Sequence, residues 1–160
     1  MTSAREPKPA APAQERPPLP RIGEIERYFA ERPDLGVAAV YLFGSHAEGR
    51  AHRESDVDLG VLLKWDAKPR HDDRFEVRLR LLGELGGVVA PAVPDVVILN
   101  DAPPMLGRRV VVSGIRIFLA DAKADHAYVR DVQLRAADLV PFLRRMRQLK
   151  LEWLARPPSP

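Results

Sequence analysis

Gly44 and Ser45 interrupt an apolar run of strand length, residues 37–43, and could bind phosphate. A turn that leads from a strand into a helix leaves backbone N–H groups without helical partners, and such groups bind phosphate oxygens. Gly44 allows the backbone to come close to a ligand, and the Ser45 hydroxyl supplies one more donor. Taken alone, however, the pair is more typical of a turn that simply ends a strand.

Ten residues later, Asp56 and Asp58 place two carboxylates at the start of a second apolar run, residues 57–63. Residues i and i+2 of a strand point to the same face, so the two side chains would lie together. Neighbouring carboxylates repel each other, and a divalent cation removes that repulsion because it accepts oxygen ligands. In isolation, a solvated turn at the strand entry would explain such a pair more simply.

Asp95 opens a third apolar run, residues 95–99, and could lie beside the strand that carries Asp58. It would then complete three carboxylates able to hold two Mg²⁺ ions about 3.5–4 Å apart. Asp95 could also act as general base toward an attacking hydroxyl, although a turn aspartate after Pro94 fits the residue types equally well. The combination is more specific than its parts and predicts a site for a metal beside a triphosphate.

The elements that must position these residues alternate along the chain. We expect strands at residues 37–43, 57–63, 95–99 and 115–119, and helices at residues 22–32, 72–86, 105–112 and 123–155, with a short polar helix through Ala47. Gly86-Gly87 should end the second long helix, and Pro141 should kink or divide the last one. This order predicts an α/β (α+β) domain in which a small mixed sheet is flanked by helices.

One domain accounts for most of the chain. Residues 1–20 hold six of the sixteen prolines and are expected to form a disordered leader. Residues 21–155 are expected to form a single domain that includes the C-terminal helical segment. That segment carries an apolar stripe, part of which is expected to cover the sheet, and any part left over would form a docking surface. It also carries a basic group, which could contact an acidic partner or RNA, or could be a solvated helix face. The stripe consists of Leu139, Phe142, Leu143, Met146, Leu149 and Trp153, and the basic group of Arg144, Arg145, Arg147 and Lys150.

The composition excludes several classes of protein. The chain has no cysteine, which excludes disulfides and thiolate metal sites and is compatible with the cytoplasm, where we expect the protein to act. No apolar run approaches the ~20 residues that span a bilayer, so no membrane contact is expected. A net charge of +3 does not by itself imply nucleic acid, and direct binding of nucleic acid is not expected.

Charged side chains near the two motifs have mostly ordinary explanations. His46 and His52 are expected to be exposed loop residues without a catalytic task. Arg50 and Arg53 could neutralise the charge of a triphosphate, or could be solvated loop residues. Arg108 and Arg109 are expected to be surface residues of a helix.

The stretch LFGSHAEGRAHRESDVDLGVLL, residues 42–63, resembles the signature of the MNT-type minimal nucleotidyltransferases of the DNA-polymerase-beta nucleotidyltransferase superfamily. Their pattern is close to LFGSxAxGxxxxxSDxDL, which Ala47, Gly49, Ser55 and Leu59 match as well as the core residues do. The similarity continues through PDVVILNDAPPML and GIRIFLAD into the last helix. It therefore covers about residues 22–150.

The resemblance implies a polymerase-beta-like nucleotidyltransferase fold and a role for each site residue. Asp56, Asp58 and Asp95 would be catalytic ligands of Mg²⁺, and Gly44 and Ser45 would hold the nucleotide phosphates. The implied reaction transfers AMP from ATP to a hydroxyl and releases pyrophosphate. MNT proteins are antitoxins paired with HEPN-type ribonuclease toxins, so the implied acceptor is a tyrosine hydroxyl of a partner toxin, which the transfer would neutralise.

Two other functions stay open at this point. Glu48 precedes Gly49 where members of the family commonly carry arginine, and a binding antitoxin that blocks the toxin sterically, with weak catalysis, would tolerate that change. The chain could also be a free-standing nucleotidyltransferase that acts on a small molecule such as an antibiotic.

Overall fold

The computed structural model describes residues 21–52 and 55–155. The expected proline-rich leader, residues 1–20, lies outside these residues, and so does Arg53. The strands are β1 (Val37–Phe43), β2 (Val57–Leu63), β3 (Pro94–Ile98) and β4 (Ile115–Leu119). The α-helices are α1 (Ile22–Ala30), α2 (Gly44–Ala47), α3 (His71–Val89), α4 (Pro104–Ser113) and α5 (Ala122–Leu154), and two short 3₁₀ helices are η1 (Pro33–Leu35) and η2 (Leu99–Asp101).

The four strands form one mixed sheet in the order β3-β2-β1-β4. β1 runs antiparallel to both β2 and β4, whereas β2 and β3 are parallel. A parallel pair needs a crossover connection, and α3 supplies it. The expected fold, a small mixed sheet flanked by helices, is confirmed.

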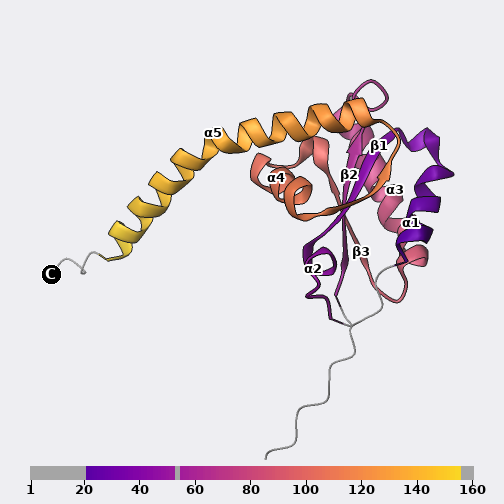
Figure 1. The fold of residues 1–160 in the computed structure, drawn as a ribbon, viewed down its shortest axis with the longest axis horizontal. Helices are drawn as coiled ribbons and strands as arrows, with labels where there is room; N and C mark the ends of the chain where they lie inside the picture. Colours follow the sequence, from indigo (N-terminus) through magenta and orange to yellow (C-terminus); the bar gives the residue numbers. More distant parts are fainter. Residues whose placement is uncertain (1–20, 53–54, 156–160) are drawn as a thin grey trace, which may run out of the picture.

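Helices cover both faces of the sheet, with α1 and α3 on one face and α4 and the first part of α5 on the other (Figure 1). Along β1, Val40 and Leu42 belong to the apolar cluster shared with α1 and α3. The alternating residues Tyr41 and Phe43 belong to a second cluster, shared with α4 and the first part of α5. Because both faces are buried, β1 is an uninterrupted apolar run with every residue buried.

A buried carboxylate ties the second face together. Asp125 of α5 is 0% exposed and accepts a hydrogen bond from the Tyr41 hydroxyl at 2.6 Å. The Arg116 guanidinium of β4 donates to the other carboxylate oxygen at 2.7 Å. The three side chains join β1, β4 and α5, and both oxygens of Asp125 have a partner, as a buried charge requires.

The second long helix does not end at Gly86-Gly87, so that expectation was wrong. α3 continues to Val89, because Leu85 and Val89 are both buried in the cluster under α3. Burial of a valine contributes about 1.5–3 kcal/mol, which offsets the roughly 1 kcal/mol that each glycine costs inside a helix.

Pro141 does not divide α5, which remains one helix of 33 residues. Figure 1 shows that its axis bends near the middle, where the missing N–H of proline removes one backbone hydrogen bond. The first half packs on α4 and β1 through buried Tyr128, Val132 and Ala136. None of the helices in residues 21–52 and 55–155 combines the length and apolar character that crossing a membrane requires.

Candidate functional site

Asp58 lies at the centre of the site because its strand lies between β1 and β3. The register pairs Asp58 with Phe43 on β1 and with Asp95 on β3. Neighbouring strands are separated by about 4.8 Å, so the backbones of the two aspartates are adjacent. The expectation that Asp95 lies beside the strand of Asp58 is therefore confirmed.

The Asp58 carboxylate points to the face that α4 covers. Asp58 alternates with Val57 and Leu59, which belong to the cluster under α1 and α3, so its side chain lies on the opposite face. Further along that face, a side chain in place of Gly60 would collide with Val110 of α4. The site is therefore bounded by the end of β1, the start of β2 and the helix α4.

Gly44 makes room for the Asp58 carboxylate. It follows β1 directly and has φ of 70°, in the left-handed region that glycine adopts without strain. A Cβ atom at this position would overlap Oδ2 of Asp58. The Gly44-Ser45 turn and Asp58 are thus in direct contact, although ten residues separate Ser45 from Asp56 in the sequence.

The surroundings of Asp58 disfavour its negative charge. Partial burial raises the pKa of its carboxyl group, and the charges of Asp95 and Asp56 raise it further. His46 and Arg109 act in the opposite direction. A carboxylate held among other carboxylates is stabilised when a cation joins them.

The oxygen donors suit a hard divalent cation, although they are not gathered into a closed cage. Within residues 21–52 and 55–155, no three His, Asp or Glu side chains are close enough to form a ready metal site. Asp56 and Asp95 are exposed, and Asp58 is half-buried between them. The donor type and the mutual repulsion of these three carboxylates therefore fit Mg²⁺, and an ion would have to draw their exposed side chains together.

The expectation that His46 is an exposed loop residue was wrong, because only 7% of it is exposed. α2 turns the imidazole back toward the start of β2, where Nε2 lies 3.4 Å from the carbonyl oxygen of Ser55. The Ser55 hydroxyl in turn accepts a hydrogen bond from the backbone N–H of His52 at 2.7 Å. These contacts hold together the two ends of the loop that separates Ser45 from Asp56.

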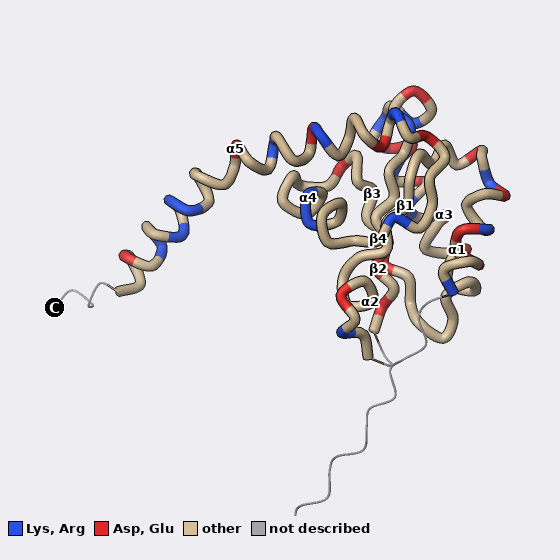
Figure 2. Tube along the Cα trace, viewed as in Figure 1, with Lys and Arg blue, Asp and Glu red and all other residues tan. Residues whose placement is uncertain are grey.

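Glu48 takes part in a small ion-pair cluster at the edge of the site. Its carboxylate pairs with Arg109 of α4 at 3.1 Å and also contacts Arg50. Figure 2 shows acidic and basic segments next to one another around α2. Arg109 is a surface residue, as expected, but it also lies close enough to lower the pKa of Asp58. This neighbourhood was missed in the sequence, because 61 positions separate Glu48 from Arg109.

Comparison with known proteins gives one family. Residues 23–123 match the family described as Polymerase beta, Nucleotidyltransferase, which is more than half of the chain. None of the curated proteins shows significant similarity in sequence.

Several solved structures share the fold. A toxin–antitoxin structure with AMP-PNP has 23% identity and a TM-score of 0.57, covering 85% of this chain and 99% of the other. The tri-AMPylated HEPN toxin of Shewanella oneidensis in complex with MNT antitoxin has 20% identity and a TM-score of 0.52, covering 84% and 99%. The toxin–antitoxin MntA–HepT has 20% identity and a TM-score of 0.51, covering 85% and 99%. At these identities the likeness establishes the fold.

Proposed function

Because the chain belongs to the Polymerase beta nucleotidyltransferase family, we propose that it is an antitoxin that transfers AMP from ATP to a tyrosine hydroxyl of a HEPN-type ribonuclease toxin. The observation that carries the proposal is the position of Asp58, which lies between Asp95 and the Gly44 turn. This arrangement supports the proposal, because it brings oxygens suited to a divalent metal next to a turn suited to phosphate. We also assign the protein to the cytoplasm, where ATP is available and with which a chain without cysteine is compatible.

The site residues divide into two groups. Asp56, Asp58 and Asp95 would hold Mg²⁺, two ions when all three carboxylates take part. Bound there, Mg²⁺ would neutralise charge on the triphosphate and lower the pKa of the attacking hydroxyl. Gly44 and Ser45 would bind phosphate oxygens through backbone N–H groups and the Ser45 hydroxyl.

The proposed AMP transfer needs no reactant besides ATP and the tyrosine hydroxyl. The tyrosine oxygen forms a bond to the α-phosphorus of ATP, and the bond from that phosphorus to the bridging oxygen of pyrophosphate breaks. The phenolic proton passes to the carboxylate of Asp95, which is exposed at the start of its strand and therefore accessible to an acceptor. Backbone N–H groups of the Gly44 turn would stabilise the charge that develops on the transferred phosphoryl group.

The proposed acceptor is supported by the structures that share the fold. One contains AMP-PNP and another a tri-AMPylated HEPN toxin, so nucleotide binding and AMP transfer occur in complexes of this architecture. A partner protein of this kind would bring its own acceptor hydroxyl to the site.

The test is the intact mass of a HEPN-type partner co-expressed with this chain. We expect increments of one or more AMP units with the wild-type chain and none with the Asp56→Ala/Asp58→Ala double variant. Asp66→Ala, at an exposed position after β2, is the control and should leave the increments unchanged. An unmodified partner in a tight complex with the wild-type chain would instead show that the antitoxin acts by steric blocking.

A further inference from the structure

The C-terminal half of α5 extends away from the rest of the molecule. We call residues 139–154 the arm. At 1.5 Å per residue the arm is about 24 Å long, and Figure 1 shows it leaving the domain beyond α4. From Pro141 onward every described residue of the arm is exposed.

The apolar pattern of α5 does not stop where the domain stops. Tyr128 and Val132 are buried at the start of a series in which apolar residues recur every three or four positions. The series continues through buried Ala136 and half-buried Leu139 into the arm, in the spacing by which one helix packs against another. Its exposed apolar members and their neighbours, between 43% and 70% exposed, are Phe142, Leu143, Met146, Leu149, Trp153 and Leu154.

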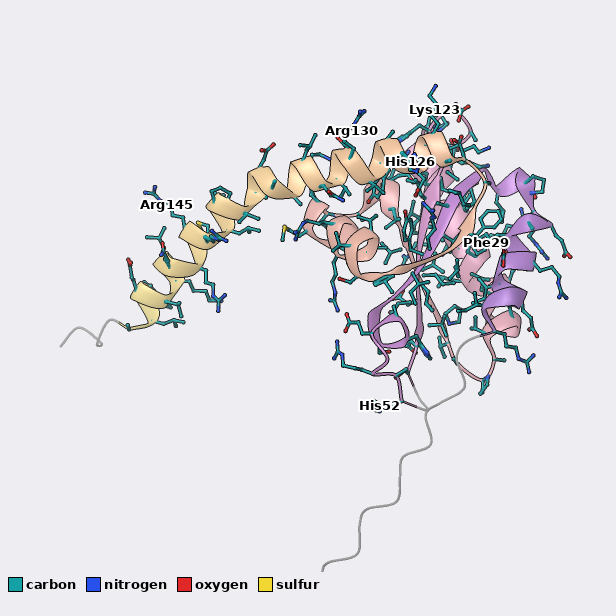
Figure 3. All side chains as sticks on the ribbon, viewed as in Figure 1. Phe29, His52, Lys123, His126, Arg130 and Arg145 are labelled. Carbon is teal, nitrogen blue, oxygen red and sulfur yellow. The ribbon has the colours of Figure 1, made fainter. Side chains whose placement is uncertain are left out.

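The arm is also strongly basic. It carries four basic residues and one acidic residue, Glu152. Arg145 precedes Leu149 by four positions and Arg147 follows Leu143 by four, so arginines flank the apolar stripe on both sides. Figure 3 shows Arg145 on the part of α5 farthest from the sheet, where the described part of the chain offers it no ion pair.

These features favour one occupant over the others. Pairing two copies of the arm would bring like charges together, which opposes a second copy of this chain. A membrane surface would attract the arginines, but membrane binding does not explain why the three-and-four repeat continues a helix-packing face. Helices of another protein with acidic side chains match both the repeat and the charge.

We propose that the arm docks into an apolar groove between helices of the acceptor protein, with carboxylates on both rims of that groove. This proposal rests on the proposed function, because it takes the docked protein to be the one that receives AMP. α4 covers the sheet face to which Asp58 points, and the arm bends toward the side on which α4 and α2 lie (Figure 1). A protein held by the arm therefore lies on the same side as the site.

The experiment compares two variants of the full-length chain, Met146→Asp and Gln148→Asp. Both positions are exposed and both gain the same charge, but only Met146 lies on the apolar stripe. Isothermal titration calorimetry with the HEPN-type partner should show binding weakened about 100-fold by Met146→Asp and by less than about 3-fold by Gln148→Asp. Arg145→Glu should also weaken binding, by a larger factor at low salt than at high salt.

A kinetic readout separates docking from chemistry. Met146→Asp should raise KM for the partner and leave kcat for AMP transfer unchanged, so that saturating partner restores full modification. Equal affinity of Met146→Asp and Gln148→Asp, or a loss of kcat with unchanged KM, would overturn the proposed docking while AMP transfer stands. If the wild-type partner carries no AMP but binding still depends on Met146, the docking stands and the proposed reaction fails.

Two other outcomes would assign the arm a different occupant and overturn the proposal. One is a dimer of this chain alone that Met146→Asp dissociates. The other is binding to vesicles of anionic lipid that Met146→Asp abolishes, together with unchanged affinity for the partner.

Discussion

Asp58 and Asp125 are both aspartates on the α4–α5 side of the sheet, but their surroundings are opposite. Asp125 is fully buried, and its two oxygens accept hydrogen bonds from Tyr41 and Arg116. Asp58 is half-buried, and its nearest charged neighbours include two other carboxylates. No side-chain donor within the described residues makes a hydrogen bond or ion pair with Asp58.

The difference separates a carboxylate that stabilises the fold from one available to a ligand. A buried charge with a complete set of partners contributes to the native state and gains nothing from a cation. A carboxylate beside like charges costs stability in the absence of a cation, and such sites are typical of function. Each prediction below changes one side of this comparison.

The largest effect is expected for AMP transfer by Asp58→Asn. The variant removes the central charge of the three carboxylates, and loss of metal-assisted stabilisation of the transition state should lower kcat by about 10³-fold or more. The rate of pyrophosphate release with ATP, Mg²⁺ and a HEPN-type partner measures it. Asp72→Asn, at an exposed position of α3, is the control. Equal rates for the two variants would show that Asp58 takes no part in the reaction.

Asp125→Ala should have the largest effect on stability. It leaves the buried Tyr41 hydroxyl without its acceptor and Arg116 without its counter-charge, which should lower the free energy of unfolding by about 3 kcal/mol. Asp131→Ala is the matched control, because Asp131 lies on the same helix in an exposed pair with Arg135 and should cost less than about 0.5 kcal/mol. Urea denaturation followed by circular dichroism gives both values, and similar losses would refute the assigned role of Asp125.

The surroundings of Asp58 could be predicted in large part from the sequence, whereas those of Asp125 could not. Apolar runs fixed the strands, and the alternation of strands with helices indicated a mixed sheet in which Asp95 could lie beside Asp58. The Asp125 cluster could not be predicted, because a single aspartate in a helix does not reveal that its partner Tyr41 lies 84 positions away. Local patterns identify elements, whereas pairings across elements depend on how those elements pack.

The errors have the same origin. Gly86-Gly87 has the local character of a helix end, but buried Val89 extends α3 through tertiary packing. His46 is polar and lies in a short helix, but α2 folds it against the carbonyl of Ser55. Part of the apolar stripe of α5 was expected to cover the sheet, but from Phe142 onward all of its members are exposed. The residues of α5 that pack on α4 and β1 lie earlier in the helix, at Tyr128, Val132 and Ala136.

Gly44→Ala should have a smaller effect than the loss of Asp58, and we expect it in the stability of the fold. The substituted residue would have an unfavourable positive φ, and its methyl group would overlap the Asp58 carboxylate, which together should cost about 2 kcal/mol of stability. Gly49→Ala is a close control. Gly49 has nearly the same positive φ, 68°, but a Cβ atom added there would meet no other atom within 4 Å. The excess loss for Gly44→Ala, measured by thermal unfolding, isolates the contact with Asp58, and the absence of any excess would show that the carboxylate moves away freely.

The smallest effect has the opposite sign and contrasts the two aspartates most directly. In the presence of a chelator, Asp58→Asn should raise the free energy of unfolding, because it removes repulsion from Asp56 and Asp95. Solvent screens this repulsion at a half-exposed site, so the gain should be about 0.5 kcal/mol. Asp125→Asn should instead destabilise the fold, because it weakens the hydrogen bonds to Arg116 and Tyr41.

Mg²⁺ should raise the thermal midpoint of the wild type and not that of Asp58→Asn. A midpoint insensitive to Mg²⁺ would mean that repulsion among the carboxylates is relieved without a metal.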